Sequence, residues 1–359
     1  MDIKLDLLPE EKRNHECLLN LESLSFGQLR SDHMFLVDYE DGEWKDARIV
    51  PYQDFSIAPG AMVLHYGQAI FEGAKAFRIN DDELVTWRFD KNAERLNESA
   101  RILCMPEVPV ELQMDGLMRL LDVERNWCPN IDEASLYIRP FMFATQDSLG
   151  VHPSSKYTYC IMLSPSGPYY AGGFSNTVTL LVTEKFHRAT PGGTGAAKAC
   201  GNYAASLRAQ EFAKSKNCAQ VLYLDTTNTF LEEVGAMNHF HIMKDGSIVI
   251  PEFTDTILKS ITSLSILELF PNARQERIEI ADFLAKIESG EIIEAGGFGT
   301  AAVITPVGKY VTDDGKEYVV GNGEIGEHTR AIYEKYTSMQ RGDIEAPEGW
   351  LAKVPRYND

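Results

Sequence analysis

The chain has 359 residues, of which 44% are hydrophobic and 24% charged, a composition typical of a globular protein with two domains. Its net charge of −19 and its lack of a basic cluster argue against a nucleic-acid partner. The N-terminus is charged from its second residue, and no apolar run approaches the roughly 18 residues that cross a bilayer. The six cysteines are scattered without a CxxC pair. We therefore expect a cytoplasmic protein without a membrane span.

Strands and helices alternate in the first 165 residues. A helix is predicted from Asp90, as its N-cap, to Met105, because Ala93, Leu96 and Ala100 recur at helical spacing. Four apolar and aromatic runs bounded by turn residues predict strands: Met34–Tyr39, Ala69–Phe77, 135–145 and 157–164.

The composition changes at Ser164–Asn176, a stretch rich in Gly, Pro and Ser that predicts a connector between domains. Beyond it we predict a strand over 178–183, a helix over about 203–216 and a strand over 219–225. The predicted fold class is α/β in the broad sense, with an α+β second half built on a curved or barrel-like sheet with helices outside. The predicted domains are 1–165 and 178–359, joined by 166–177.

Lys198 lies in PGGTGAAKACGNYAAS, among glycines and alanines and just before an expected helix start at Gly201-Asn202. Small neighbours allow a flat ligand to approach closely, and a partly desolvated amine is a better nucleophile. These are the requirements of a Schiff-base lysine. The alternative, a surface lysine at a loop–helix junction, is not excluded by this segment alone. A phosphate-binding P-loop is excluded, because no Ser or Thr follows the lysine.

Glu233, in LEEVGAMN, places a carboxylate beside a glycine turn. A carboxylate at the ring nitrogen of pyridoxal phosphate keeps that nitrogen protonated, so that the ring accepts electrons when the substrate Cα loses its proton. Glu232 would point to the other side of an extended segment, and we expect it to face solvent. The alternative for Glu233 is an exposed acid at a strand end.

Three segments could bind a phosphate. Ser260–Ser263 precedes an apolar-periodic run, which predicts a helix whose first amides, those of Ile261 and Thr262, favour an anion. Gly296–Ala302 is expected to be a loop of small residues in which Thr300 offers a hydroxyl. Arg95, on the helix from Asp90, could supply positive charge. Each signal is weak alone, but together with Lys198 and Glu233 they predict pyridoxal phosphate as the cofactor.

Two further features are interpreted as structural. His239 and His241 lie two residues apart on a predicted strand, but no third ligand has a suitable spacing, so we expect packing histidines and no metal site. The helix predicted over 326–339 carries a charged pattern typical of a surface helix.

Six strings resemble the branched-chain amino-acid aminotransferases of the fold-type IV pyridoxal-phosphate group: LHYGQAIFEGAKAF, SLYIRP, LSPSGPYY, GGTGAAKACGNYAAS, EEVGAMN and GGFGTAA. The resemblance runs from about Leu24 to the C-terminus. It implies a smaller N-terminal α/β domain and a larger C-terminal pseudo-barrel domain that binds pyridoxal 5'-phosphate. It also implies a transaminase that moves the amino group of L-leucine, L-isoleucine or L-valine reversibly to 2-oxoglutarate. The products are the branched-chain 2-oxo acid and L-glutamate, formed by a ping-pong cycle through pyridoxamine phosphate in branched-chain amino-acid biosynthesis or degradation.

The resemblance also assigns residues by position. Lys198 would bind the cofactor and move the substrate proton, Glu233 would hold the ring nitrogen, and Tyr203 would hydrogen-bond the phenolic oxygen. The phosphate would be bound by Arg95, Ile261, Thr262 and Thr300. The substrate pocket would comprise Phe26, Phe71, Tyr137 and Tyr169, with Ala236 and Ala301 near the substrate carboxylate and Arg139 recognising glutamate. Tyr66, Leu149 and Val151 match positions supplied by a neighbouring subunit, which implies a homodimer.

The sequence departs from the family pattern at two places. Ala302 and Thr305 stand where some members carry a CxxC redox pair, so we expect no such thiol regulation, and Ala236 replaces a threonine. Two alternatives share the lysine and glutamate within the fold, namely D-amino-acid aminotransferases and aminodeoxychorismate lyases, whose substrate-binding strings differ. A cofactor-free binding protein would be colourless, whereas the predicted enzyme is yellow.

Overall fold

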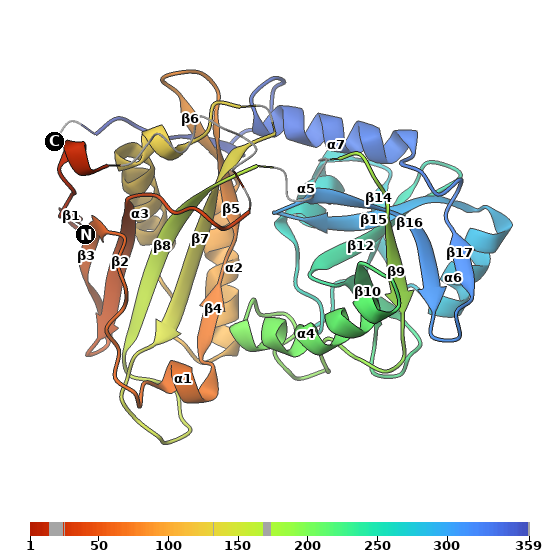
Figure 1. The fold of residues 1–359 in the computed structure, drawn as a ribbon, viewed down its shortest axis with the longest axis horizontal. Coiled ribbons are helices and arrows are strands. Elements are labelled where there is room, and N and C mark those ends of the chain that lie inside the picture. Colours follow the sequence, from red (N-terminus) through yellow and green to blue (C-terminus); the bar gives the residue numbers. More distant parts are fainter. Residues whose placement is uncertain (14–23, 25, 132, 168–173, 358–359) are drawn as a thin grey trace. The chain divides into compact units, whose positions relative to one another are not determined.

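Residues 1–13, 24, 26–131, 133–167 and 174–357 are described by the computed structural model, in which the chain divides into two units (Figure 1). The first unit comprises Met1–Tyr169, Ala197–Cys200 and Ser338–Asp359, and the second comprises Tyr170–Ala196 and Gly201–Thr337. Short segments around Lys198 and at the C-terminus therefore belong with the N-terminal sheet. In the described part of the chain, no helix is long and apolar enough to cross a membrane.

The first unit is built on a sheet whose strands run in the order β1-β3-β2-β8-β7-β5-β6-β18, with β4 beside β7. All its described pairings are antiparallel except β1 with β3, which is parallel. The strands are β1 Lys4–Leu5, β2 His33–Glu40, β3 Glu43–Pro51, β4 Ala69–Phe71, β5 Ala74–Arg78, β6 Leu84–Trp87, β7 Ser135–Ala144, β8 Tyr157–Ser166 and β18 Leu351–Lys353. Its helical segments are η1 Glu10–Lys12, α1 Met62–Tyr66, α2 Phe89–Ile102, α3 Val110–Val123 and η4 Arg125–Trp127.

The core of the first unit lies between the sheet and the helices α2 and α3. Alternate residues of β7, such as Leu136 and Ile138, join this core with Leu96 of α2 and Leu117 of α3. Because successive side chains of a strand point to opposite faces, the odd-numbered residues of β7 lie on the other face of the sheet. Tyr137 and Arg139 are thereby directed away from the helices.

Two sequence expectations for this unit need correction. The strand expected over Ala69–Phe77 is divided into β4 and β5 at Glu72, whose N–H still donates to Pro140 of β7 and whose side chain forms a buried ion pair. The helix expected to have Asp90 as its N-cap begins at Phe89, so Asp90 lies in its first turn. Arg88 is the N-cap instead. It has a left-handed backbone with φ 47°, and its N–H donates to the carbonyl of Trp350. The strands predicted near β2, β7 and β8 are confirmed.

The second unit contains a closed ring of strands, as the sequence predicted. Strands β11, β10, β9, β16, β15 and β12 pair in that order, and the pairing of β11 with β12 closes the ring. The strands of this unit are β9 Val178–Val182, β10 Gln220–Leu224, β11 Leu231–Val234, β12 Met237–Met243, β13 Ile248–Pro251, β14 Ala273–Glu276, β15 Ile292–Gly299, β16 Val303–Thr312 and β17 Glu317–Val319. Its helices are α4 Cys200–Ser215, α5 Ile261–Leu269 and α6 Ile280–Ser289, and α7 Glu327–Gln340 begins in it.

Helix packing on this sheet follows the two-residue period of the strands. Leu181 and Val221 contact Ala209 of α4, whereas their neighbours Leu180 and Leu222 belong to a second cluster with α6. The expectation that helices pack outside the curved sheet is confirmed by α4. The predicted positions of α4 and α7 are also confirmed to within a few residues.

His239 and His241 are packing histidines, as expected. They are 0% and 4% exposed, and burial lowers the pKa of His241 to about 3. Nε2 of His239 lies 3.0 Å from the hydroxyl of Tyr310, and both imidazole rings pack against Phe283. Among the described residues, no group of three or more His, Cys, Asp or Glu side chains could hold a metal ion.

Candidate functional site

Lys198 is held by its backbone at the edge of the first unit's sheet. Its N–H donates to Ser99 Oγ on α2 at 2.8 Å, and its carbonyl accepts from the N–H of Phe71 at 3.1 Å. The next residue, Ala199, forms a bridge with Ile70 of β4. The ammonium lies 4.9 Å from the centre of the Phe71 ring. Lys198 is therefore a lysine in a fixed place among buried small residues, rather than an ordinary surface lysine.

A buried ion pair that the sequence analysis missed lies beside Lys198. The Glu72 carboxylate accepts two hydrogen bonds from Arg95, at 2.7 and 2.9 Å, and a third from Asn92 Nδ2 at 2.8 Å. Burial by itself raises the pKa of Glu72, but the charges of Arg95 and Lys198 and the hydrogen bonds outweigh it and lower the pKa overall. Glu72 thus keeps its charge and orients Arg95, the predicted phosphate ligand. Its signal in the sequence is an acid inside the apolar run AIFEGAKAF.

Four predicted substrate residues form one cluster on the first unit. Arg139 Nη2 donates to the Tyr137 hydroxyl at 2.9 Å, and its guanidinium carbon lies 4.9 Å from the Phe71 ring centre. The rings of Phe26 and Tyr137 meet edge to face at 4.8 Å. A Cβ at position 73 would lie 2.2 Å from the Tyr137 hydroxyl oxygen, so any other residue than Gly73 would displace the Tyr137 side chain. The cluster combines aromatic walls with one cation.

Arg139 has an unused donor within this cluster. Its Nε is buried and, among the described residues, has no hydrogen-bond partner. An unsatisfied buried donor is costly, so such a group is expected to meet a ligand. The predicted pocket residue Tyr169 lies outside the described residues.

The three residues predicted to serve a neighbouring subunit lie together at one exposed end of the first unit. The Tyr66 hydroxyl donates to the carbonyl of Leu149. Leu149 is 70% exposed and Val151 is 84% exposed, unusually high values for apolar side chains.

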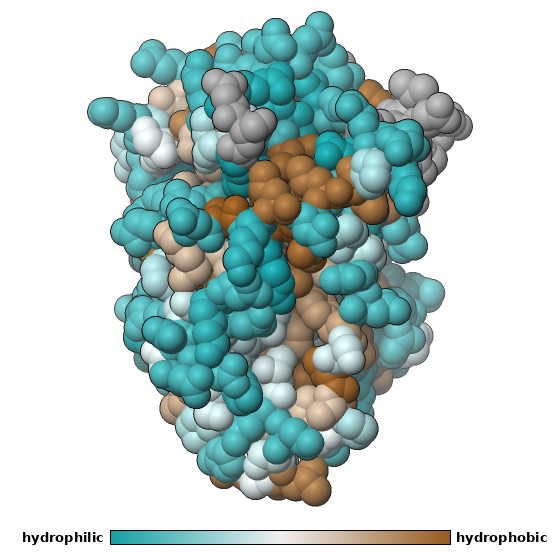
Figure 2. Space-filling view, turned by 90° about the vertical axis from the view of Figure 1, so that its left-hand side faces the viewer, coloured by the Kyte–Doolittle hydropathy of each residue, from teal (hydrophilic) through white to brown (hydrophobic). Residues whose placement is uncertain are grey.

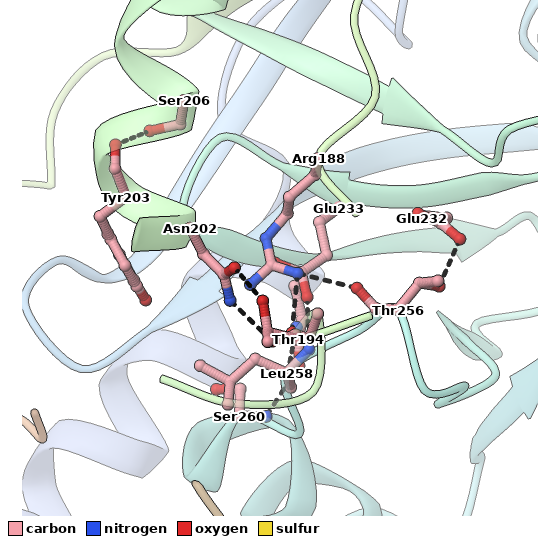
Figure 3. Close-up of polar contacts among 12 residues, drawn as sticks. Arg188, Thr194, Asn202, Tyr203, Ser206, Glu232, Glu233, Thr256, Leu258 and Ser260 are labelled. Carbon is pink, nitrogen blue, oxygen red and sulfur yellow. Dashed lines mark hydrogen bonds and ion pairs between the residues drawn. The ribbon is translucent and has the colours of Figure 1, made fainter. Parts of the chain in front are cut away.

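Glu233 is buried in the second unit, and the alternative of an exposed strand-end acid is wrong. It is 2% exposed, and its Oε1 accepts the N–H of Leu258 at 2.7 Å. Its Oε2 lies 3.2 Å from Nε of Arg188, whose side chain is also buried (Figure 3). Arg188 Nη1 in turn donates to the carbonyls of Gly195 and Thr256 at 3.0 and 2.8 Å. Arg188 therefore neutralises Glu233 and fixes its direction. A lone arginine in KFHRAT gave no sequence signal.

The expectation that Glu232 faces solvent is wrong. Its side chain points to the other side of β11 from Glu233, as predicted, but it is 6% exposed and accepts the Thr256 hydroxyl at 2.5 Å (Figure 3). Burial raises the pKa of Glu232 more than the Thr256 hydrogen bond lowers it. The reason for the error is that every residue of β11 is buried, and Thr256 covers the face that carries Glu232.

Helix α5 begins where the sequence predicted. Ser260 is its N-cap, and its hydroxyl accepts the N–H of Ser263 at 3.4 Å. Ile261 and Thr262, the predicted phosphate ligands, are the first two residues of the helix and are buried. The positive end of the dipole of this nine-residue helix therefore lies at Ile261 and Thr262.

The segment Gly296–Ala302 is not a loop throughout. Gly296–Gly299 belongs to β15, and only Thr300–Ala302 forms a turn before β16. Gly296 is required for packing, because a Cβ there would lie 2.6 Å from the Phe240 ring. Thr300 and Ala301 are partly exposed in the turn.

Tyr203 lies in the first turn of α4, and the turn itself is fixed to the preceding segment. The side chain of Asn202 accepts from the Thr194 hydroxyl and donates to the Thr194 carbonyl, both at 2.7 Å (Figure 3). Ala236 is exposed between β11 and β12. Glu233, Arg188, Tyr203, Ile261 and Thr300 all belong to the second unit, whereas Lys198, Arg95 and Arg139 belong to the first.

The chain is similar to known proteins over most of its length. The amino-transferase class IV family matches residues 69–310. The chain is 45% identical to a probable branched-chain-amino-acid aminotransferase of Staphylococcus epidermidis over 93% of this chain and 94% of that one. It is 43% identical to branched-chain-amino-acid transaminase 1 of Bacillus subtilis, over 92% and 94% respectively. The crystal structure of the Escherichia coli branched-chain amino acid aminotransferase is similar, with a TM-score of 0.73 and 26% identity, covering 90% of this chain and 99% of that one.

Replacing Glu72 with glutamine should leave the Arg95 charge buried without a counter-charge. Breaking such a pair costs about 3 to 5 kcal/mol of the free energy of unfolding. Glu94→Gln is the control, on the helix that carries Arg95, because Glu94 pairs with Lys91 at the surface and its loss should cost less than about 1 kcal/mol. Urea unfolding of the two variants measures the difference. Equal, small losses would show that Glu72 does not balance Arg95.

Proposed function

The chain belongs to the class IV aminotransferase family, and we propose that its reaction is the reversible transfer of the amino group of L-leucine, L-isoleucine or L-valine to 2-oxoglutarate. The observation that carries the substrate assignment is the cluster of Phe71, Tyr137 and Arg139, which offers an apolar wall and a cation side by side. Both half-reactions need these two properties in one pocket, because the amino donor has an apolar side chain and the acceptor an acidic one. The high identity to branched-chain aminotransferases supports the same substrates.

The donor set fits pyridoxal phosphate, the cofactor of this family. A lysine amine on a fixed backbone, a buried carboxylate held by an arginine, and the first amides of α5 correspond to its aldehyde, ring nitrogen and phosphate. When bound, the cofactor supplies a ring that accepts the electrons of the Cα–H bond. Lys198 would hold it covalently and then carry the proton at the substrate Cα.

The remaining residues of this set would bind and orient the cofactor. Glu233, paired with Arg188, would hold a proton on the ring nitrogen, and Tyr203 would hydrogen-bond the phenolic oxygen. The phosphate would be bound by Arg95, Ile261, Thr262 and Thr300. Arg95 suits this role, since Glu72 fixes the plane of its guanidinium.

Substrate selection would rest on the aromatic cluster. Each methylene buried against Phe26, Phe71 and Tyr137 contributes about 0.8 kcal/mol, and Tyr169 would complete this wall. The Arg139 guanidinium would pair with the side-chain carboxylate of glutamate or 2-oxoglutarate. Ala236 and Ala301 would leave room for the substrate α-carboxylate beside backbone amides. D-amino acids would be poor substrates.

We also propose a homodimer in the cytoplasm. Support comes from the exposed apolar side chains at α1 and at the β7–β8 connection, where Leu64 is 58%, Leu149 70% and Val151 84% exposed. Apolar residues also gather in a band between hydrophilic regions on the face shown in Figure 2. Such surfaces are usually covered by a partner. Tyr66, Leu149 and Val151 would then reach the active site of the second copy. The net charge of −19 speaks against a nucleic-acid partner.

Lys198→Ala should abolish transamination of L-leucine, because both the covalent anchor and the proton carrier are lost. Lys214→Ala is the control, since Lys214 lies at the surface of α4 and pairs with Glu211. Steady-state assays with L-leucine and 2-oxoglutarate should find full activity in the control and none above background in Lys198→Ala. Sustained turnover by Lys198→Ala would exclude the proposed role.

The double variant Leu149→Asp and Val151→Asp should weaken the dimer, because two charges would be buried at its contact. We expect a lower mass by light scattering at low protein concentration, together with lower transaminase activity. Val319→Asp, at an exposed position of the second unit, should change neither. A monomeric, fully active wild-type protein would contradict the proposed assembly.

A further inference from the structure

Asn238 ends the string LEEVGAMN and lies on β12, directly opposite Glu233 on β11. Opposed residues of an antiparallel pair share one face of the sheet, with Cβ atoms about 5 Å apart. Asn238 is 3% exposed, so each polar group of its side chain needs a partner inside the protein. These partners lie in the segment that leads into α5 and in the first turn of that helix.

Three hydrogen bonds join the Asn238 side chain to this segment and to the first turn of α5. Nδ2 donates to the carbonyl of Leu258 at 2.9 Å, and Oδ1 accepts from the N–H of Ser260 and from Ser263 Oγ, both at 3.0 Å. The N–H of the same Leu258 donates to Glu233 Oε1 (Figure 3). The opposed side chains of Glu233 and Asn238 thus hold both polar backbone groups of Leu258.

Only an amide satisfies these contacts. The Leu258 carbonyl requires a donor and the Ser260 N–H requires an acceptor, so the orientation of the Asn238 amide follows from its partners. An aspartate would have the same shape and keep both acceptor contacts. It would, however, set a carboxylate oxygen against the Leu258 carbonyl and add a second negative charge opposite Glu233.

We infer that Asn238 is a positioning residue that sets the first amides of α5 for the cofactor phosphate while it keeps the Leu258 amide on Glu233. Ser260 and Ser263 are both fixed by Asn238, and the N–H of Ser263 by the Ser260 hydroxyl. The amides of Ile261 and Thr262 therefore lie between two fixed points. The inference rests on the proposed function, because it takes the start of α5 as the phosphate site.

One segment of backbone then serves both ends of the cofactor. Loosening it releases the phosphate amides and, through Leu258, one hydrogen bond to the carboxylate at the ring nitrogen. A residue with a purely structural role would lower the stability of the fold without changing the state of a bound phosphate.

The test is Asn238→Asp in the full-length protein, with pyridoxal phosphate as the probe. Its dissociation constant is measured by titrating the cofactor-free protein and following visible absorbance. The ionisation of the bound phosphate is followed by its phosphorus NMR shift as a function of pH. We expect affinity to fall about tenfold or more, since a buried carbonyl loses its donor. We also expect the phosphorus shift, constant with pH in the wild type, to titrate near about pH 6, as for a solvated phosphate.

Two further variants keep the test decisive. Ser263→Ala removes one of the three contacts of Asn238 and should change both readouts in the same direction, but by less. This variant replaces Asn238→Asp in the test if Asn238→Asp fails to fold. Asn97→Asp is the matched control, because Asn97 is a buried amide that bonds both backbone groups of Val108, at 2.8 and 2.9 Å. It should lower the melting temperature and leave the phosphorus titration unchanged.

Wild-type affinity and a pH-independent phosphorus signal in both Asn238→Asp and Ser263→Ala would overturn the inference. An equal effect of Asn97→Asp would also overturn it, because the change would then be a general loss of stability. Failure of the wild-type protein itself to bind pyridoxal phosphate at Lys198 would contradict the proposed function instead.

Discussion

The pairing of β11 with β12 is the contact on which the second unit depends. It closes the ring of strands, and it places Glu233 opposite Asn238 and Glu232 on the reverse face. The short connection turns at Gly235, where φ is +53° and a Cβ would lie 2.6 Å from Gln220 Oε1. Because side chains alternate along a strand, a register slip of one residue would exchange Glu232 for Glu233. The position of one carboxylate thus follows from ring closure.

Buried charges are balanced in the same way in each unit. Glu72 pairs with Arg95 in the first unit, and Glu233 pairs with Arg188 in the second. Buried ion pairs contribute little net stability, because desolvation offsets their attraction, but they fix the direction of charged groups. In the proposed function, a carboxylate would hold a proton on a ring nitrogen and a guanidinium would meet a phosphate, and both roles would need that fixed direction. These pairs are therefore better explained by function than by stability.

Local pattern was enough to predict much of this structure from the sequence. Strands β2, β7 and β8 follow from apolar and aromatic runs bounded by turn residues, and α5 follows from the serine-led segment before an apolar-periodic run. What could not be predicted depends on partners distant in the chain. Arg188 is an isolated loop arginine until β11 brings Glu233 to it, and Glu72 is an isolated acid in an apolar run until α2 brings Arg95 to it. Glu232 was placed in solvent because a single strand does not reveal that a distant segment, that of Thr256, covers its second face.

The central claim is that this chain uses pyridoxal phosphate at Lys198 to transaminate branched-chain L-amino acids. The most direct measurement is the visible spectrum of the purified protein as L-leucine, and separately D-alanine, is added. The account predicts a yellow protein whose colour is bleached by L-leucine and is not changed by D-alanine. Adding 2-oxoglutarate after L-leucine should restore the yellow colour. Bleaching by D-alanine alone would contradict the substrate assignment. A protein that stays colourless with added pyridoxal phosphate would contradict the cofactor site itself.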